Sequence, residues 1–149
     1  MSERGIHLMK VADRQIADLI ALFSSTDEAV LHSPCPGREK LGDGTIAACA
    51  RHTADSYVRI ARFVRGEGQE GHGRGYRSQD IDLEGLLTRL SAARSALEIL
   101  ADQTDEQLDA VPLSGEMKFC DGQRTLEQII AKLLQHQGHN VDALKRAVS

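Results

Sequence analysis

Two histidines lie inside separate amphipathic segments of this chain, and they are its clearest candidates for chemistry. His52 lies in the segment GTIAACARHTADSYVRIARFV, and His136 lies in the segment RTLEQIIAKLLQHQGHNVDAL. Neutral imidazole is a common protein ligand of divalent transition metals. A fold that brings these two rings together would form a metal site or the remnant of one.

Apolar residues at intervals of three or four predict long helices and no buried strand. The expected helices cover about residues 9–23, 45–65, 83–102 and 125–147. Helices of this kind cannot bury their apolar faces alone, so we expect an all-α protein, an antiparallel four-helix bundle with residues 1–149 as a single domain. The proline- and glycine-containing stretch 33–43 predicts a loop. A glycine-rich loop is expected at residues 66–75, between the second and third helices.

Helical geometry, at about 100° per residue, predicts where the histidines point. An apolar stripe on the last helix is expected to face the interior, and it consists of Ile129, Leu133, His136 and Asn140. His52 is expected at the margin of the buried side of the second helix, whereas His139 points away from the apolar face. A buried Asn140 would need hydrogen-bond partners or a ligand.

These segments, with the third amphipathic helix between them, resemble the DinB-like family of bacterial four-helix-bundle proteins. The resemblance implies a divalent ion, zinc or nickel, held by a histidine on the second helix and an HxxxH pair on the last. His52 and His136 match the first two positions, and Asn140 occupies the third, so HxxxH reads HQGHN. The implied metal ligands are therefore His52, His136 and Asn140. Because asparagine is a weak ligand for these metals, His139 or Cys49 are alternatives for completing the site.

Two functions follow from the resemblance. Family members with assigned activities are thiol S-transferases and thiol-dependent isomerases, so the first hypothesis is a metal-dependent enzyme of this type, with an incomplete histidine site and a low-molecular-weight thiol. No residue stands out as catalytic. The alternative is a non-catalytic, stress-associated dimeric bundle with a vestigial metal site or a small-ligand cleft. A purely structural interaction protein without a cleft is a third hypothesis. The resemblance also implies a homodimer.

Net charge, apolar runs and cysteine spacing limit the classes of partner and the location that we expect for this protein. The net charge is −4 without a basic run, which argues against nucleic-acid binding. No stretch reaches the roughly 18 consecutive apolar residues of a membrane span. Three cysteines without CxxC spacing, and no apolar leader, predict reduced thiols in a soluble cytoplasmic protein. The expected partner is a small molecule.

Two weaker motifs are interpreted as structural. The stretch 66–71 matches GxGxxG, but it follows a helix and carries two glutamates that would repel phosphate, so we expect no dinucleotide site. Cys120 precedes the last helix, whose dipole would favour a thiolate. An inert, half-buried thiol is nevertheless the favoured interpretation of Cys120.

Overall fold

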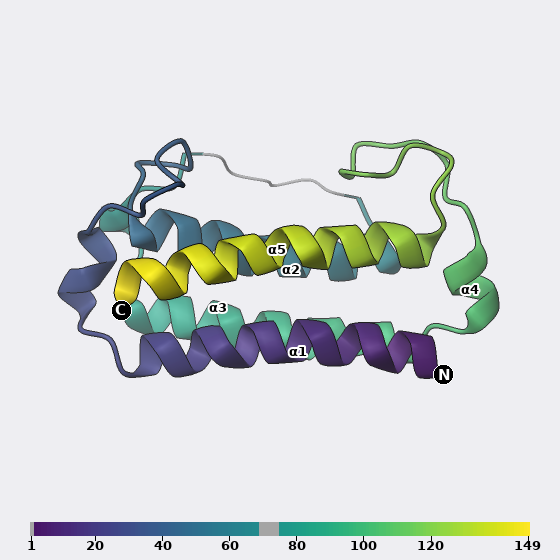
Figure 1. Ribbon diagram of the computed structural model, residues 1–149, viewed down its shortest axis with the longest axis horizontal. Helices are drawn as coiled ribbons and strands as arrows, with labels where there is room; N and C mark the ends of the chain where they lie inside the picture. Colours follow the sequence, from purple (N-terminus) through teal and green to yellow (C-terminus); the bar gives the residue numbers. More distant parts are fainter. Residues whose placement is uncertain (1, 69–74) are drawn as a thin grey trace.

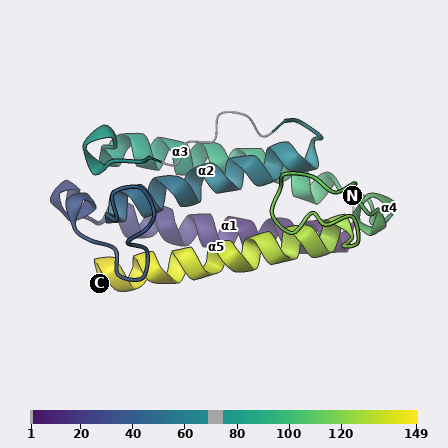
Figure 2. The ribbon, with the colours of Figure 1, turned by 90° about the horizontal axis from the view of Figure 1, so that it is seen from above.

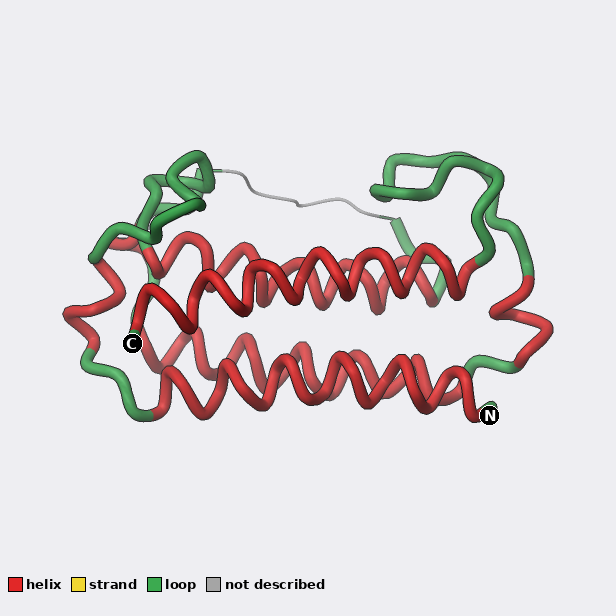
Figure 3. The backbone as a smooth tube through the Cα atoms, viewed as in Figure 1, coloured by secondary structure: helices red, strands yellow, loops and turns green. Residues whose placement is uncertain are grey.

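The structure, a computed structural model, describes residues 2–68 and 75–149, and the chain in these ranges is helical apart from turns, loops and one isolated β-bridge. The long helices lie side by side (Figures 1 and 2) and are α1 (Glu3–Ser24), α2 (Ile46–Val64), α3 (Leu83–Ala96) and α5 (Leu126–Val148). The short ones are η1 (Glu28–His32), η2 (Ser78–Asp80), η3 (Leu97–Asp102) and α4 (Asp105–Asp109). The prediction of an all-α protein is confirmed, since helices joined by loops and turns make up the described chain (Figure 3). The glycine-rich loop predicted at 66–75 lies largely outside the described residues.

The helix directions differ from the antiparallel arrangement that the sequence predicts. Two contacts show that α2 and α3 run parallel. In the middle of the helices, Asp55 of α2 accepts a hydrogen bond from Arg89 of α3, and at their ends Arg65 donates to the Ala96 carbonyl. Helices α1 and α5 also run in one direction, opposite to α2 and α3 (Figure 2). The amide of Asp43 donates to the Tyr76 carbonyl, so the chain is back beside the start of α2 before α3 begins. Apolar periodicity sets the buried face of a helix but not its direction, which is why the prediction of alternating directions is wrong.

Helix α1 begins six residues before the predicted start near residue 9. Ser2 caps it: its hydroxyl accepts a hydrogen bond from the amide of Gly5 and donates one to the Gln103 carbonyl. The apolar repeat becomes visible only at Leu8, so periodicity alone places the start too late. The cap also attaches the first turn of α1 to the end of η3.

The third predicted helix, over residues 83–102, is present, but its last part is a 3₁₀-helix from Leu97 to Asp102. Capping boxes are present at the starts of α4 and α5. In each, a threonine hydroxyl accepts from the amide three residues on, and the glutamine there accepts from the threonine amide. These caps satisfy backbone amides that a helix leaves unpaired at its start.

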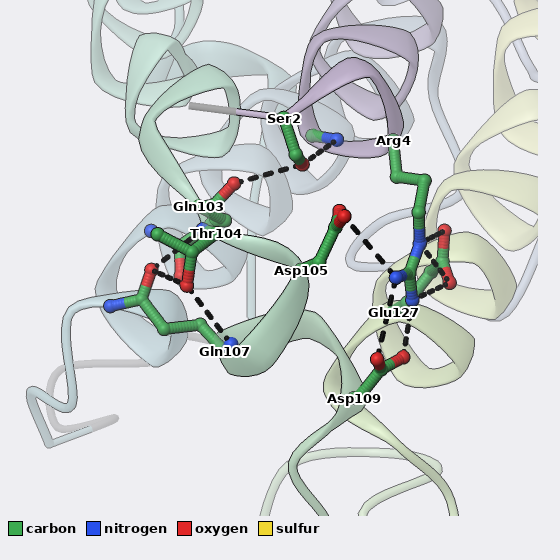
Figure 4. A network of polar contacts seen from close by, with 9 residues as sticks. Ser2, Arg4, Gln103, Thr104, Asp105, Gln107, Asp109 and Glu127 are labelled. Atoms are coloured by element: carbon green, nitrogen blue, oxygen red, sulfur yellow. Dashed lines mark hydrogen bonds and ion pairs between the residues drawn. The ribbon is translucent and has the colours of Figure 1, made fainter.

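A network of ion pairs around Arg4 joins three helices at one end of the molecule (Figure 4). The Arg4 guanidinium, on the first turn of α1, donates to Asp109 of α4 and to Glu127 of α5, and it lies 3.5 Å from Asp105. Each pair is exposed or half-buried and is therefore weak by itself. Together they fix how the short α4 segment meets the starts of the two long helices.

The core consists mainly of leucine, isoleucine and alanine, and Tyr57 is one of its few aromatic side chains. The Tyr57 hydroxyl donates to Oε1 of Gln15 at 2.7 Å, and Nε2 of Gln15 donates to the Leu134 carbonyl at 3.0 Å. These two hydrogen bonds connect α2, α1 and α5. Burial raises the pKa of the Tyr57 phenol. Within the described ranges, no helix is both long and apolar enough to cross a membrane.

Candidate functional site

Helix α2 presents His52 at the edge of its buried face, as the sequence predicts. Thr45 caps the helix by accepting from the amide of Ala48. The buried side of α2 consists of the half-buried Val64 and five buried residues, Ile46, Cys49, Thr53, Tyr57 and Ile60. The His52 ring is half-buried, and its centroid lies 6.3 Å from that of Tyr76 in the segment before α3.

Helix α5 presents His136 to the interior and His139 to solvent, which confirms the expected directions. The residue between them, Gln137, is 2 % exposed, and its Nε2 donates to the Thr53 carbonyl of α2 at 2.8 Å. Gln137 was not among the predicted site residues, although it follows Leu133 by one helical turn on the apolar stripe. This bond fixes the relative heights of α2 and α5 beside the histidines.

His52 and His136 line one cavity of about 200 Å³ between α2 and α5, which we call the histidine cavity. Met117 and Lys118, from the segment that precedes α5, contribute to its wall. The fold therefore brings the two sequence-predicted imidazoles to a single site. Neither Asn140 nor His139 lines it.

Asn140 is held instead by Arg38, a residue that the sequence analysis missed. Nε of Arg38 donates to Oδ1 of Asn140 at 2.7 Å, and Nη1 of Arg38 donates to the Gly37 carbonyl. Asn140 is 2 % exposed, and a buried amide oxygen needs a hydrogen-bond donor. Arg38 supplies that donor. Arg38 lies in the loop that follows η1, where no periodic pattern marks a buried contact.

The surroundings of His136 are cationic. Burial lowers the pKa of the His136 imidazole below its usual value, and the positive charges of Lys118, Arg38 and His139 lower it further. Desolvation and like charge both favour the neutral ring. The same charges would oppose a divalent cation at this position.

Cys49, one turn before His52, is fully buried and does not line the histidine cavity. Its thiol contacts that of Cys35, and burial raises the pKa of Cys49 to about 12. The Cys35 thiol is also buried, and desolvation raises its pKa too. Cys120 is 5 % exposed, and its Sγ donates to the Leu113 carbonyl. All three cysteines are reduced.

The residues present do not fit the implied zinc or nickel ion. Oδ1 of Asn140 already accepts from a guanidinium, and a cation bound there would displace that donor and face its charge. In the described parts of the chain, no three histidine, cysteine, aspartate or glutamate side chains gather closely enough to hold a metal. Two imidazoles with an engaged asparagine form a poor site for either metal.

Comparison with known proteins assigns the chain to a family. The family model described as the DinB superfamily matches residues 12–143, which includes all of α2, α3 and the HQGHN segment. Neither the curated proteins nor the solved structures contain a match to the chain. Because the family model covers most of the sequence, the chain belongs to the DinB superfamily.

Proposed function

We propose that this DinB-superfamily protein uses the histidine cavity to bind a small organic molecule, and that the cavity replaces the metal centre of its family. The observation that carries this proposal is the bond from Arg38 to Asn140, which engages the third expected ligand. The cavity itself keeps His52 and His136, the two positions that carry the family resemblance. The protein is then a bundle of DinB-like type with a vestigial metal site, as in the non-catalytic hypothesis.

A second function is favoured by a single observation, namely that both imidazoles line one cavity. A divalent ion held by His52 and His136 would supply Lewis-acid chemistry, which favours the thiolate form of a thiol. The protein would then be a thiol S-transferase or thiol-dependent isomerase that uses a low-molecular-weight thiol. Arg38 would have to release Asn140 for the full ligand set to form.

Metal titration followed by histidine NMR separates the two functions. Untagged protein with isotopically labelled histidine receives zinc and then nickel, while the ring signals of His52 and His136 are followed. The ligand-binding function predicts no stoichiometric metal and joint movement of both signals with small organic probes. Stoichiometric metal that is lost in both His52→Ala and His136→Ala would support the enzyme hypothesis instead. His139→Ala is the matched control, because His139 lies on the same helix but faces solvent.

The homodimer is a separate proposal. Two large apolar side chains, Val111 and Leu113, are 48 % and 92 % exposed in the segment before α5. Exposed apolar side chains of this kind are candidates for contact with a second copy. Light scattering on the purified protein tests the dimer, and Leu113→Ser tests whether this segment contributes to it.

A further inference from the structure

We propose that residues 111–124, which we call the α4–α5 loop, form a lid that opens as one unit and gives access to the histidine cavity while the helices stay folded. This inference rests on the proposed function, because it concerns entry to the same cavity. Two observations carry it. The loop forms part of the cavity wall, and its hydrogen bonds do not attach it to the helices.

The α4–α5 loop turns back over α2 and α5 at the end of the molecule where α5 begins (Figures 1 and 2). Met117 and Lys118 of the loop line the cavity together with His52 of α2 and His136 of α5. Met117 is 7 % exposed and belongs to the hydrophobic core. Movement of the loop away from the helices would therefore remove one wall of the cavity and admit solvent or a ligand.

The two ends of the α4–α5 loop lie together, because the amide of Leu126 donates to the Ala110 carbonyl at 2.8 Å. Further bonds cross the inside of the loop. The amide of Gly115 donates to the Cys120 carbonyl, and Sγ of Cys120 donates to the Leu113 carbonyl. A surface loop with adjacent ends that is packed by its own side chains is an Ω-loop, a structure that can keep its shape when it moves.

In the part of the chain that the structure describes, every hydrogen bond and ion pair of residues 111–124 stays inside this stretch. The Asp121 carboxylate accepts from the amides of Gln123 and Arg124 and pairs with the Arg124 guanidinium, which also donates to the Phe119 carbonyl. A segment that keeps its hydrogen bonds can leave the surface without exposing newly unpaired polar groups. Opening therefore breaks mainly apolar contacts, together with the contact of Lys132 of α5 with the Phe119 ring.

The loop at the other end of the bundle, residues 33–44, is attached in a different way (Figure 1). Arg38 of that loop donates to Asn140 of α5, the amide of Asp43 donates to the Tyr76 carbonyl, and the Asp43 carboxylate accepts from the amide of Ser78. Movement of that loop would break all of these bonds. Local opening is therefore easier at the α4–α5 loop, beside the cavity, than at the opposite end.

Alkylation of the native thiols tests whether the loop opens by itself. Cys120 lies in the loop and is 5 % exposed, whereas Cys49 lies on α2 and is fully buried. The wild-type protein is treated with iodoacetamide at increasing, non-denaturing concentrations of urea, and mass spectrometry measures the rate at each cysteine. We expect Cys120 to react faster than Cys49 and to depend much less on urea, because opening of the loop exposes less surface than unfolding does.

Met117→Ala tests whether this opening uncovers the cavity. The variant truncates one of the buried side chains of the loop, so the alkylation rate of Cys120 should rise about tenfold or more. Cys120 does not line the cavity, so a larger cavity alone would not produce this rise. Modification of His136 by diethyl pyrocarbonate should accelerate as well, while that of the exposed His139 stays unchanged. Glu116→Ala is the matched control, because Glu116 is exposed and does not line the cavity.

Three results would overturn the inference. Equal alkylation rates at Cys120 and Cys49, with the same urea dependence, would show that the loop moves only when the bundle unfolds. Alkylation of native Cys120 as fast as in the unfolded protein would show that the loop does not protect this thiol. Faster alkylation of Cys120 in Met117→Ala without faster modification of His136 would show that the loop does not cover the cavity. The proposed function fails by a different readout, namely stoichiometric metal bound by both histidines.

Discussion

The bond between Arg38 and Asn140 joins the loop after η1 to helix α5, and its loss should be measurable as a coupling energy. Hydrogen bonds to a charged group contribute about 1.5–3 kcal/mol, and an unsatisfied buried acceptor costs about 1–3 kcal/mol. Asn140 is 2 % exposed and the N–O distance is 2.7 Å, so the bond belongs to the stronger part of this range. Arg38 is half-buried, which lets water replace part of the interaction. We therefore expect Arg38→Met to lower the free energy of unfolding by about 2 kcal/mol.

A double-mutant cycle isolates the pair. Arg38→Met, Asn140→Leu and the double variant are unfolded in urea, and helix content is followed by circular dichroism. In the double variant no buried acceptor is left unpaired, so we expect a coupling energy of about 1–2 kcal/mol. Arg38→Met combined with Arg4→Gln is the control, because Arg4 contacts Glu127 in the first turn of α5, several turns away from Asn140. Additivity of Arg38→Met and Asn140→Leu within about 0.5 kcal/mol would refute the structural reasoning.

Three further predictions follow from single residues. Gly5→Ala should lower stability by about 1–3 kcal/mol in urea unfolding, although alanine favours helices, because its Cβ would lie 2.5 Å from the Leu100 carbonyl oxygen. The folded-state pKa of His136, measured by NMR titration, should lie below 6.5 and rise in Lys118→Met. Since the unfolded chain binds that proton first, this residue should make stability fall as the pH drops below about 6.5. Cys49 should be alkylated by iodoacetamide far more slowly in the native protein than in urea, because burial raises its pKa to about 12.

Matched controls make these predictions decisive. Gly68→Ala, at a position where a Cβ meets nothing within 4 Å, should be close to neutral, and a Gly5→Ala variant as stable as the wild type would contradict the close approach of α1 to η3. Lys132→Met should leave the His136 titration almost unchanged, so an equal shift in both lysine variants would contradict the assigned neighbours. Alkylation of native Cys49 as fast as in urea would show that the thiol is accessible.

The sequence carried enough information to predict the helices and the faces that they bury, because apolar periodicity and capping pairs are local. Thr125 and Gln128 mark the start of α5, and the stripe through Leu133 and His136 predicts its buried face. The family resemblance, the apolar stripe of α5 and the buried side of α2 together predicted that His52 and His136 lie on helix faces that pack against each other. No comparable local sequence pattern predicts how the loops bend or in which direction each helix runs.

Contacts from loops to the core were therefore missed. Arg38 lies within the proline- and glycine-containing stretch 33–43, and nothing in its sequence neighbourhood indicates that it reaches α5. The parallel run of α2 and α3 also differs from the predicted antiparallel arrangement, because no local pattern in the sequence sets the direction of a helix. Gln137 could have been predicted as a buried residue, because it occupies the apolar stripe one helical turn after Leu133.

If the bond from Arg38 to Asn140 takes the place of a metal centre, removing the arginine and restoring a histidine should create one. Calorimetric titration of zinc compares the wild type with the double variant Arg38→Met, Asn140→His. We expect no stoichiometric zinc site in the wild type and a stoichiometric site in the double variant, because a third imidazole is restored and the guanidinium is gone. Tight, stoichiometric zinc binding by the wild-type protein would show that the bond does not replace a metal centre.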